Sequence, residues 1–150
     1  MNTTTQTEIT LISDRQRMNF FKKFNNNPAL FSIVELNLYQ LADQQIENYD
    51  GGLWKFHYSE QFDVPWFELS EDEIHVQVAG NWFDKEVSSE VGSMALTSII
   101  YNRFCWHYYE KQNETLSKLF AHYFQALSDL AGARLDAGQK EYIEFFNIID

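Results

Sequence analysis

The sequence predicts an α+β fold: a small antiparallel sheet in mid-chain, flanked by N- and C-terminal helices. Before residue 49 and after residue 88, apolar residues recur at steps of three and four, the spacing of amphipathic helices. Between residues 53 and 79 the step changes to two, the period of strands. Because helices and strands are segregated along the chain, we expect a meander of three to four strands rather than a parallel sheet.

The chain has 150 residues, the length of one domain. Residues 1–12 are polar and predict a flexible N-terminal tail, and residues 13–150 are expected to form a single α+β domain. Aromatic residues make up 17% of the chain, which indicates a bulky core or a core together with an aromatic contact patch.

Two helices are expected before the sheet. The first spans residues 13–24, with Ser13 or Asp14 as its cap and Met18 and Phe21 facing inward. The second begins at Pro28, after Asn27, and runs to about residue 48. Its apolar stripe consists of Leu30, Phe31, Val34, Leu38, Leu41 and Ala42.

The two glycines after this helix, Gly51 and Gly52, predict a turn. Glycine tolerates the left-handed backbone that often follows a helix, so the pair eases the entry into a strand. A phosphate-binding loop has the opposite order, with glycines opening a helix, and the chain contains neither GxGxxG nor GxxxxGK[ST]. We expect these residues to fix the sheet and its turns: Gly51, Gly52, Trp54, Phe56, Gly80 and Asn81.

The first and third expected strands each have one apolar side. The first places Trp54, Phe56 and Tyr58 on that side, and the third does the same with Ile74, Val76 and Val78. The middle strand spans residues 64–69. Pro65 cannot donate a ladder hydrogen bond, so it should lie at the start of that strand or on an unpaired side. A fourth strand over residues 83–87 is possible.

Three helices are expected after the sheet. Ser88 or Ser89 caps a helix over residues 89–110, and Asn113 starts the next. Ala137 and Gly138 interrupt the pattern before a final short helix over residues 139–149.

The charge of the chain is negative and uneven. The formal net charge is −11, and residues 60–90 hold nine acidic residues against Lys85 alone. Direct binding to nucleic acid is disfavoured, because phosphate contact needs a basic surface. If the acidic residues form a partner-binding patch rather than a solvated rim, its members are expected to be Glu71, Asp72, Glu73, Asp84 and Glu86.

No residue pattern indicates an enzyme. Histidines with the spacing of a zinc helix and a G-x-S-x-G nucleophile elbow are both lacking, so no catalytic residue, metal ligand or cofactor is expected. Cys105 lies between Phe104 and Trp106 and is interpreted as a buried thiol. A hydrolase or ligand-binding alternative requires a concave pocket that joins His57 or His75 to two carboxylates.

A cytoplasmic location is expected. A single cysteine excludes an internal disulfide, which fits a reducing compartment. The polar start lacks the features of a signal peptide, and no run of about 18 apolar residues is present.

Four short segments resemble the ArdB/KlcA antirestriction family. Residues 49–56 are similar to its Y-x-GG-x-W-x-F segment, and residues 78–83 are similar to its GN-x-F turn. Residues 88–92 are similar to its serine-and-glycine helix start, and Ile148, Ile149 and Asp150 are similar to its usual end. The segments occur in the family's order and extend over nearly the whole chain.

The resemblance implies an antirestriction protein. Members of the family are carried by plasmids, phages and genomic islands, and they reduce DNA cleavage by type I restriction-modification enzymes of the host. The family fold is a small α+β domain, and no catalytic residue transfers from it. The implied partner is the restriction enzyme or a host factor that controls it, with neither direct nucleic acid binding nor a membrane involved.

Two mechanisms follow from the resemblance. A DNA mimic would copy the phosphates of about 40 Å of duplex, roughly 23 charges at one charge per ~1.7 Å. A net charge of −11 falls short of that density. A non-catalytic contact between proteins is therefore preferred, with acidic mimicry as the alternative.

Overall fold

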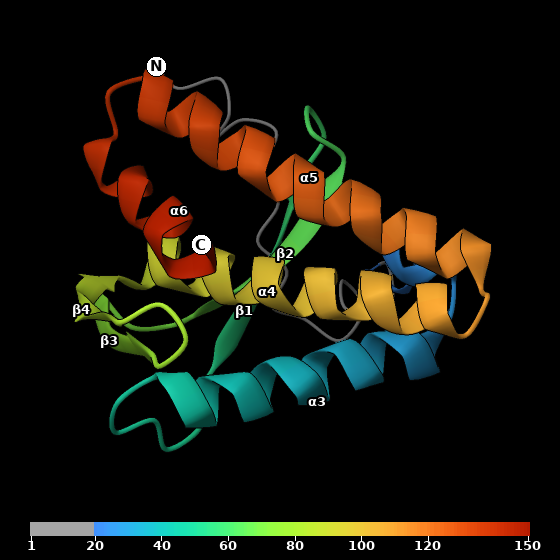
Figure 1. Ribbon diagram of the computed structural model, residues 1–150, viewed down its shortest axis with the longest axis horizontal. Coiled ribbons are helices and arrows are strands. Elements are labelled where there is room, and N and C mark those ends of the chain that lie inside the picture. The colour runs from blue at the N-terminus through green and yellow to red at the C-terminus, as the bar shows by residue number, and fades with distance from the viewer. Residues whose placement is uncertain (1–19) are drawn as a thin grey trace.

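The structure, a computed structural model, describes residues 20–150 and confirms the predicted α+β class. In Figure 1 the strands lie in mid-chain between one N-terminal helix and the C-terminal helices. The elements are η1 (Phe21–Phe24), α3 (Pro28–Gln45), β1 (Trp54–Ser59), β2 (Val64–Leu69), β3 (Glu73–Val78), β4 (Phe83–Ser88), α4 (Ser89–Glu110), α5 (Glu114–Asp136), η2 (Lys140–Tyr142) and α6 (Ile143–Ile149).

The three long helices begin where their capping residues predict. The Asn27 side chain accepts hydrogen bonds from the backbone N–H groups of Ala29 and Leu30, one residue before Pro28. Ser88 and Asn113 cap α4 and α5 in the same way. These side-chain oxygens satisfy N–H groups that have no partner within the helix.

The predicted end of the second helix is wrong by three residues. Helix α3 stops at Gln45 instead of about residue 48, because Ile46 leaves the helix and forms an antiparallel bridge with Val76. The backbone N–H of Glu47 then donates to the carbonyl oxygen of His75. Pairing with β3 therefore ends the helix before the glycines do.

The terminal helices also differ from expectation. Within the expected first helix, residue 20 is helical and residues 21–24 form a 3-10 turn, whereas residues 13–19, with the tail, lie outside the described residues. The expected final helix over residues 139–149 divides into η2 and α6. Among residues 20–150, none of the helices combines the length with the apolar character that a membrane span requires.

The strands form two separate two-stranded antiparallel sheets, not one meander. Strand β1 pairs with β2 and β3 pairs with β4, with Phe56 opposite Phe67 in the first sheet and His75 opposite Glu86 in the second. All four strands expected from the sequence are present, but β3 does not continue the ladder of β2.

The division has a physical reason in helix α4, whose side chains occupy the free edge of β2. Ser93 Oγ accepts a hydrogen bond from the backbone N–H of Leu69 at 3.1 Å, and Thr97 Oγ1 accepts one from that of Phe67 at 3.4 Å. Ser89 Oγ donates to the Leu69 carbonyl at 2.5 Å, and the Tyr101 hydroxyl donates to the Pro65 carbonyl. We call Ser89, Ser93, Thr97 and Tyr101 the hydroxyl ladder.

The hydroxyl ladder follows from helix geometry. Its members are four residues apart, so they lie on one face of α4. They contact alternate residues of β2, which share one edge of a strand. Pro65 lies on this edge, where its missing N–H breaks no pairing with β1; its predicted position on an unpaired side is confirmed.

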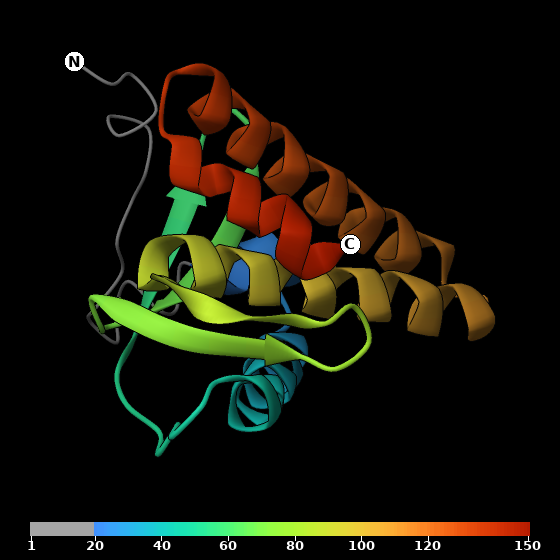
Figure 2. The same ribbon diagram turned by 60° about the vertical axis from the view of Figure 1, so that its left-hand side comes forward.

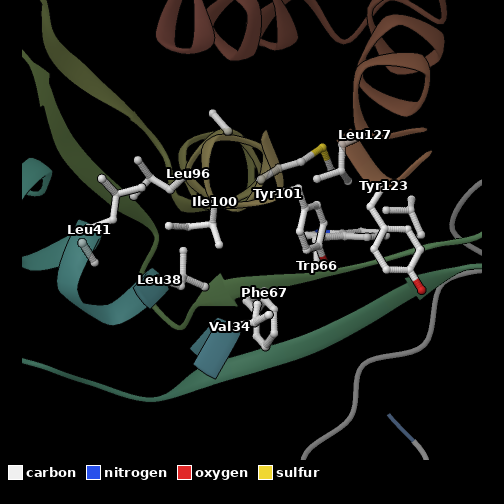
Figure 3. Packing of buried hydrophobic residues seen from close by; sticks show 14 of the residues in the cluster. Val34, Leu38, Leu41, Trp66, Phe67, Leu96, Ile100, Tyr101, Tyr123 and Leu127 are labelled. Carbon is white, nitrogen blue, oxygen red and sulfur yellow. The ribbon is translucent and has the colours of Figure 1, made fainter. Parts of the chain in front are cut away.

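Helix α4 is the centre of the molecule. It contacts α3, α5, α6 and both sheets. Figure 3 shows the core around it, with Val34 and Leu38 of α3, Phe67 of β2, Ile100 of α4 and Leu127 of α5 packed together. The helix is buried nearly all round over its first three turns, and this fixes the second sheet against the first.

Candidate functional site

The diglycine segment is a loop between α3 and β1. Gly51 has φ +98° and Gly52 has φ +120°, values that side chains rarely allow. The next residues anchor the loop: Trp54 Nε1 donates to the Tyr49 hydroxyl at 3.1 Å, and the Trp54 ring packs 5.5 Å from that of Tyr39. Phe56 is buried against Phe31 and Phe67.

Gly52→Val is expected to lower the free energy of unfolding by about 1–3 kcal/mol, because a β-branched residue is strained at this φ. A Cβ atom at residue 52 would also lie 3.1 Å from Leu69 Cδ1. Gly80→Ala is the control, since its Cβ meets nothing within 4 Å and its φ is not in the left-handed region. Thermal unfolding of both variants checks the prediction, and equal melting temperatures would contradict it.

Asn81 joins the β3–β4 turn to the end of the chain. Its Nδ2 donates to the carbonyl oxygens of Asn147 at 3.1 Å and Ile148 at 2.9 Å, and its Oδ1 accepts from the Phe83 N–H at 3.0 Å. The side chain thereby caps the last turn of α6, where carbonyl groups lack helical partners. Two of the sequence segments that carried the family resemblance are in direct contact here.

The second sheet has one face against the core and one face outward. Ile74, Val76 and Val87 are buried. The outward side chains are those of Glu73, His75, Gln77, Asp84 and Glu86, which we call the outer face. The strand register places Glu86 opposite His75 and Asp84 opposite Gln77.

His75 is surrounded by carboxylates. Its Nε2 lies 2.5 Å from Asp84 Oδ1, and its Nδ1 lies 3.7 Å from Glu47 Oε2. The hydrogen bond with Asp84 is the largest cause of a raised pKa at His75. Desolvation opposes this increase, and the charges of Glu47, Asp84 and Glu86 add to it. The hydrogen bond between His75 and Asp84 is also the largest cause of a lowered pKa at Asp84. Both groups therefore favour their charged forms.

The His75 imidazole is expected to titrate above its ordinary value of about 6.5. Asp84→Asn should lower that pKa, because it removes the anion that stabilises the imidazolium. The raised folded-state pKa means that His75 stabilises the fold below its ordinary pKa, and that this contribution is lost as pH rises through the raised pKa. NMR titration of the ring protons in both proteins tests this; an unchanged midpoint in Asp84→Asn would contradict it.

A hollow of about 380 Å³ adjoins the outer face, between the 46–52 loop and β3. It brings together three of the five residues predicted for an acidic patch, Glu71, Glu73 and Glu86. Asp84 does not line the hollow but is hydrogen-bonded to His75, which does. Asp72 lies in the turn before β3, where its backbone carbonyl accepts a hydrogen bond from the N–H of Ser89. Sequence reasoning missed two further acids that line the hollow, Glu47 and Asp50.

Trp82 is the second feature that sequence reasoning missed as a candidate. It lies in the β3–β4 turn with φ +64° and is 90% exposed. Together with Gln44, Gln77 and Asp84 it lines a hollow of about 450 Å³ at the end of the outer face. Large aromatic side chains are seldom this exposed, and a bulky residue in the left-handed region is unusual. The signal in the sequence that could have pointed to Trp82 was its position in a predicted turn.

The other residues considered as candidates for chemistry, His57 and Cys105, lie against neighbouring side chains of the fold. His57 stacks on Trp66 at 5.1 Å and lies 3.3 Å from Glu68, whose pKa is lowered: burial opposes ionisation of Glu68, but His57 and Lys55 outweigh it. Cys105 is half-buried rather than buried as expected, with its Sγ 3.9 Å from Ser117 Oγ. Among residues 20–150, no group of three His, Cys, Asp or Glu side chains could hold a metal ion.

The structure fulfils only part of what the enzyme alternative requires. A hollow does join His75 to carboxylates, as that alternative required, but those carboxylates favour the imidazolium, which is a poor general base. The outer face is thus an ionic surface ending in an exposed indole. Fold and surface together define a small α+β protein with an acidic outer face.

Comparisons with known proteins identify the family. A family model described as "Antirestriction protein" matches residues 47–139, well over half of the chain. The chain belongs to the antirestriction protein family, and the resemblance seen in its short segments is confirmed.

One curated relative and one solved structure illustrate the likeness. The putative antirestriction protein YubI of Escherichia coli (strain K12) is 28% identical over 110 residues, which is 73% of this chain and 75% of the relative. A solved chain from work on the KlcA and ArdB proteins is 21% identical and covers 100% of both chains with a TM-score of 0.76. That likeness shows that the fold is shared.

Proposed function

We propose that the protein protects incoming phage or mobile-element DNA from type I restriction-modification enzymes of the host, by non-catalytic contact with a protein. The observation that carries the proposal is the family match over residues 47–139. The KlcA and ArdB proteins, which share the fold, are described as having antirestriction activity against type I DNA restriction systems in vivo but not in vitro. The partner is the restriction enzyme in its cellular state or a host factor that controls it.

A contact between proteins is favoured over catalysis by the chemistry of the outer face. Its histidine is held between anions and favours the charged form, and the hollow beside it is open and lined with carboxylates. Such a surface can bind cations on a partner, but it has no activated nucleophile among its side chains.

Mimicry of a DNA duplex is disfavoured by where the acids lie. Glu68 pairs with Lys55 on the first sheet, Glu90 approaches buried Arg134, and Asp63 lies beside His122. Each of these carboxylates lies beside a basic side chain, and none of them belongs to the outer face. The acidic residues of positions 60–90 therefore do not form one continuous array that could follow a phosphate backbone.

Plating of unmodified phage tests the proposal. Expression of the protein in strains with different type I systems is expected to raise the efficiency of plating in at least one of them. No change in any strain would overturn the proposed function. Purified restriction enzyme and DNA test the mimicry alternative: a mimic displaces DNA at low salt and loses this effect as salt screens its charges, whereas we expect no displacement.

A further inference from the structure

The outer face is a charged surface that the packing of the fold does not use. In Figure 2 the β3–β4 ribbon lies at the outside of the molecule, with α4 against its inner side. Glu73, Gln77, Asp84 and Glu86 are exposed, and His75 is half-buried. None of these exposed side chains contributes to the apolar core.

The charge of this face is negative along its length. The ribbon's single lysine, Lys85, lies on the other side and pairs with Glu144 of α6, which lowers the pKa of Glu144. Glu47 and Asp50 extend the acidic surface beyond the strand edge. The imidazole of His75 is the one basic group placed among these carboxylates on the outer face.

Trp82 adds an apolar anchor at the end of this charged face. The indole and Asp84 line the same hollow. An exposed aromatic ring beside carboxylates fits a lysine or arginine side chain, because the cation gains from the ring face and from the anions together. Tryptophan is also enriched among the residues that dominate the binding energy of protein interfaces.

The charge selects among possible occupants. Nucleic acid and anionic lipid would be repelled by the carboxylates. A second copy of this chain is also disfavoured, because a two-fold contact through this face would oppose like charges. A basic protein segment remains, and an enzyme that handles DNA carries basic surfaces.

We propose that the outer face and Trp82 dock a lysine- or arginine-bearing segment of the type I restriction enzyme, with the indole as the anchor. This inference rests on the proposed function and assigns it to a surface. Docking here would leave the core, the hydroxyl ladder and the α5–α6 side of the molecule unchanged.

Variants in the plating assay test the surface. Trp82→Ala and the double variant Asp84→Lys/Glu86→Lys are expected to reduce protection about tenfold or more, as for residues that dominate an interface. Trp106→Ala is the matched control, because Trp106 is 59% exposed on α4. It should retain protection. Melting temperatures of the tryptophan variants should stay near that of the wild type, since these side chains are exposed. The double variant loses the hydrogen bond between Asp84 and His75, so its plating is compared only after circular dichroism has shown that it is folded.

The outcomes separate the two proposals. Wild-type protein without protection overturns the proposed function and the docking inference with it. Wild-type protection that persists in Trp82→Ala and in the charge-reversal variant overturns the docking inference alone. Trp82→Gly guards against a folding artefact, because glycine accepts the backbone at φ +64° without strain; it should remain folded and lose protection like Trp82→Ala.

Crosslinking in cells tests the contact itself. A photoreactive benzoylphenylalanine in place of Trp82, in a strain with a tagged type I enzyme, should yield an adduct with an enzyme subunit. The same group in place of Trp106 should not. An adduct at residue 82 with nucleic acid, with a second copy of this chain or with a host protein outside the restriction enzyme would overturn the assignment, as would no adduct at all.

Discussion

Replacing Ser93 by alanine and Thr97 by valine together is expected to lower the free energy of unfolding by about 2–6 kcal/mol. Both side chains are buried and accept hydrogen bonds from backbone N–H groups of β2. Each removal leaves a buried donor without an acceptor, which costs about 1–3 kcal/mol. Chemical denaturation of the purified double variant measures the loss.

Ser98→Ala is the matched control for this experiment. Ser98 is buried on the same helix, but its hydroxyl has no hydrogen-bond partner among the described residues. Its removal should leave stability unchanged or slightly improved, because no partner is orphaned. Equal losses in Ser98→Ala and in the double variant would show that the ladder does not hold the edge of β2.

Phe67→Ala is expected to lower the free energy of unfolding by about 3–5 kcal/mol, the usual cost of removing a buried phenylalanine ring. Phe67 is fully buried in β2, and its ring lies 5.3 Å from that of Phe56 and 6.0 Å from that of Phe31. The substitution would open a cavity where the first sheet meets α3 and α4.

The same denaturation experiment provides the comparison. Trp106→Ala removes a larger ring, but one that is mostly exposed, so it should cost less than about 1 kcal/mol. A loss in Phe67→Ala as small as that in Trp106→Ala would contradict a core centred on β2.

The local features of the fold could be predicted from the sequence because their causes are local. Asn27 and Pro28 start α3, Asn113 starts α5, and alternating apolar residues mark β1 and β3. These signals act within a few residues of where they stand. The bounds of β2 and α4 agree with the predicted ones for the same reason.

The pairing of the strands could not be predicted in this way. Ser89, Ser93, Thr97 and Tyr101 are a regular polar stripe on an apolar helix, and that stripe was the signal for a covered strand edge. The polar stripe can be recognised as the cover of a strand edge only once β2 is known to lie against α4, about 30 residues away in the chain. The early end of α3 has a similar origin, since Ile46 pairs with distant Val76.

The candidate surface was predicted in its charge but not in its shape. Glu71, Glu73 and Glu86 were expected and do line one hollow, whereas Glu47 joins them only because the 46–47 segment pairs with β3. Trp82 counts as a candidate only after its exposure is known. The contribution of these residues to binding stays a prediction.

The most direct test of the whole account is the efficiency of plating of unmodified phage on paired strains, one with and one without a type I restriction system. At matched expression, the protein should raise plating on the restricting strain alone, and Trp82→Ala should abolish most of that rise. Equal plating with and without the protein on the restricting strain would contradict the account.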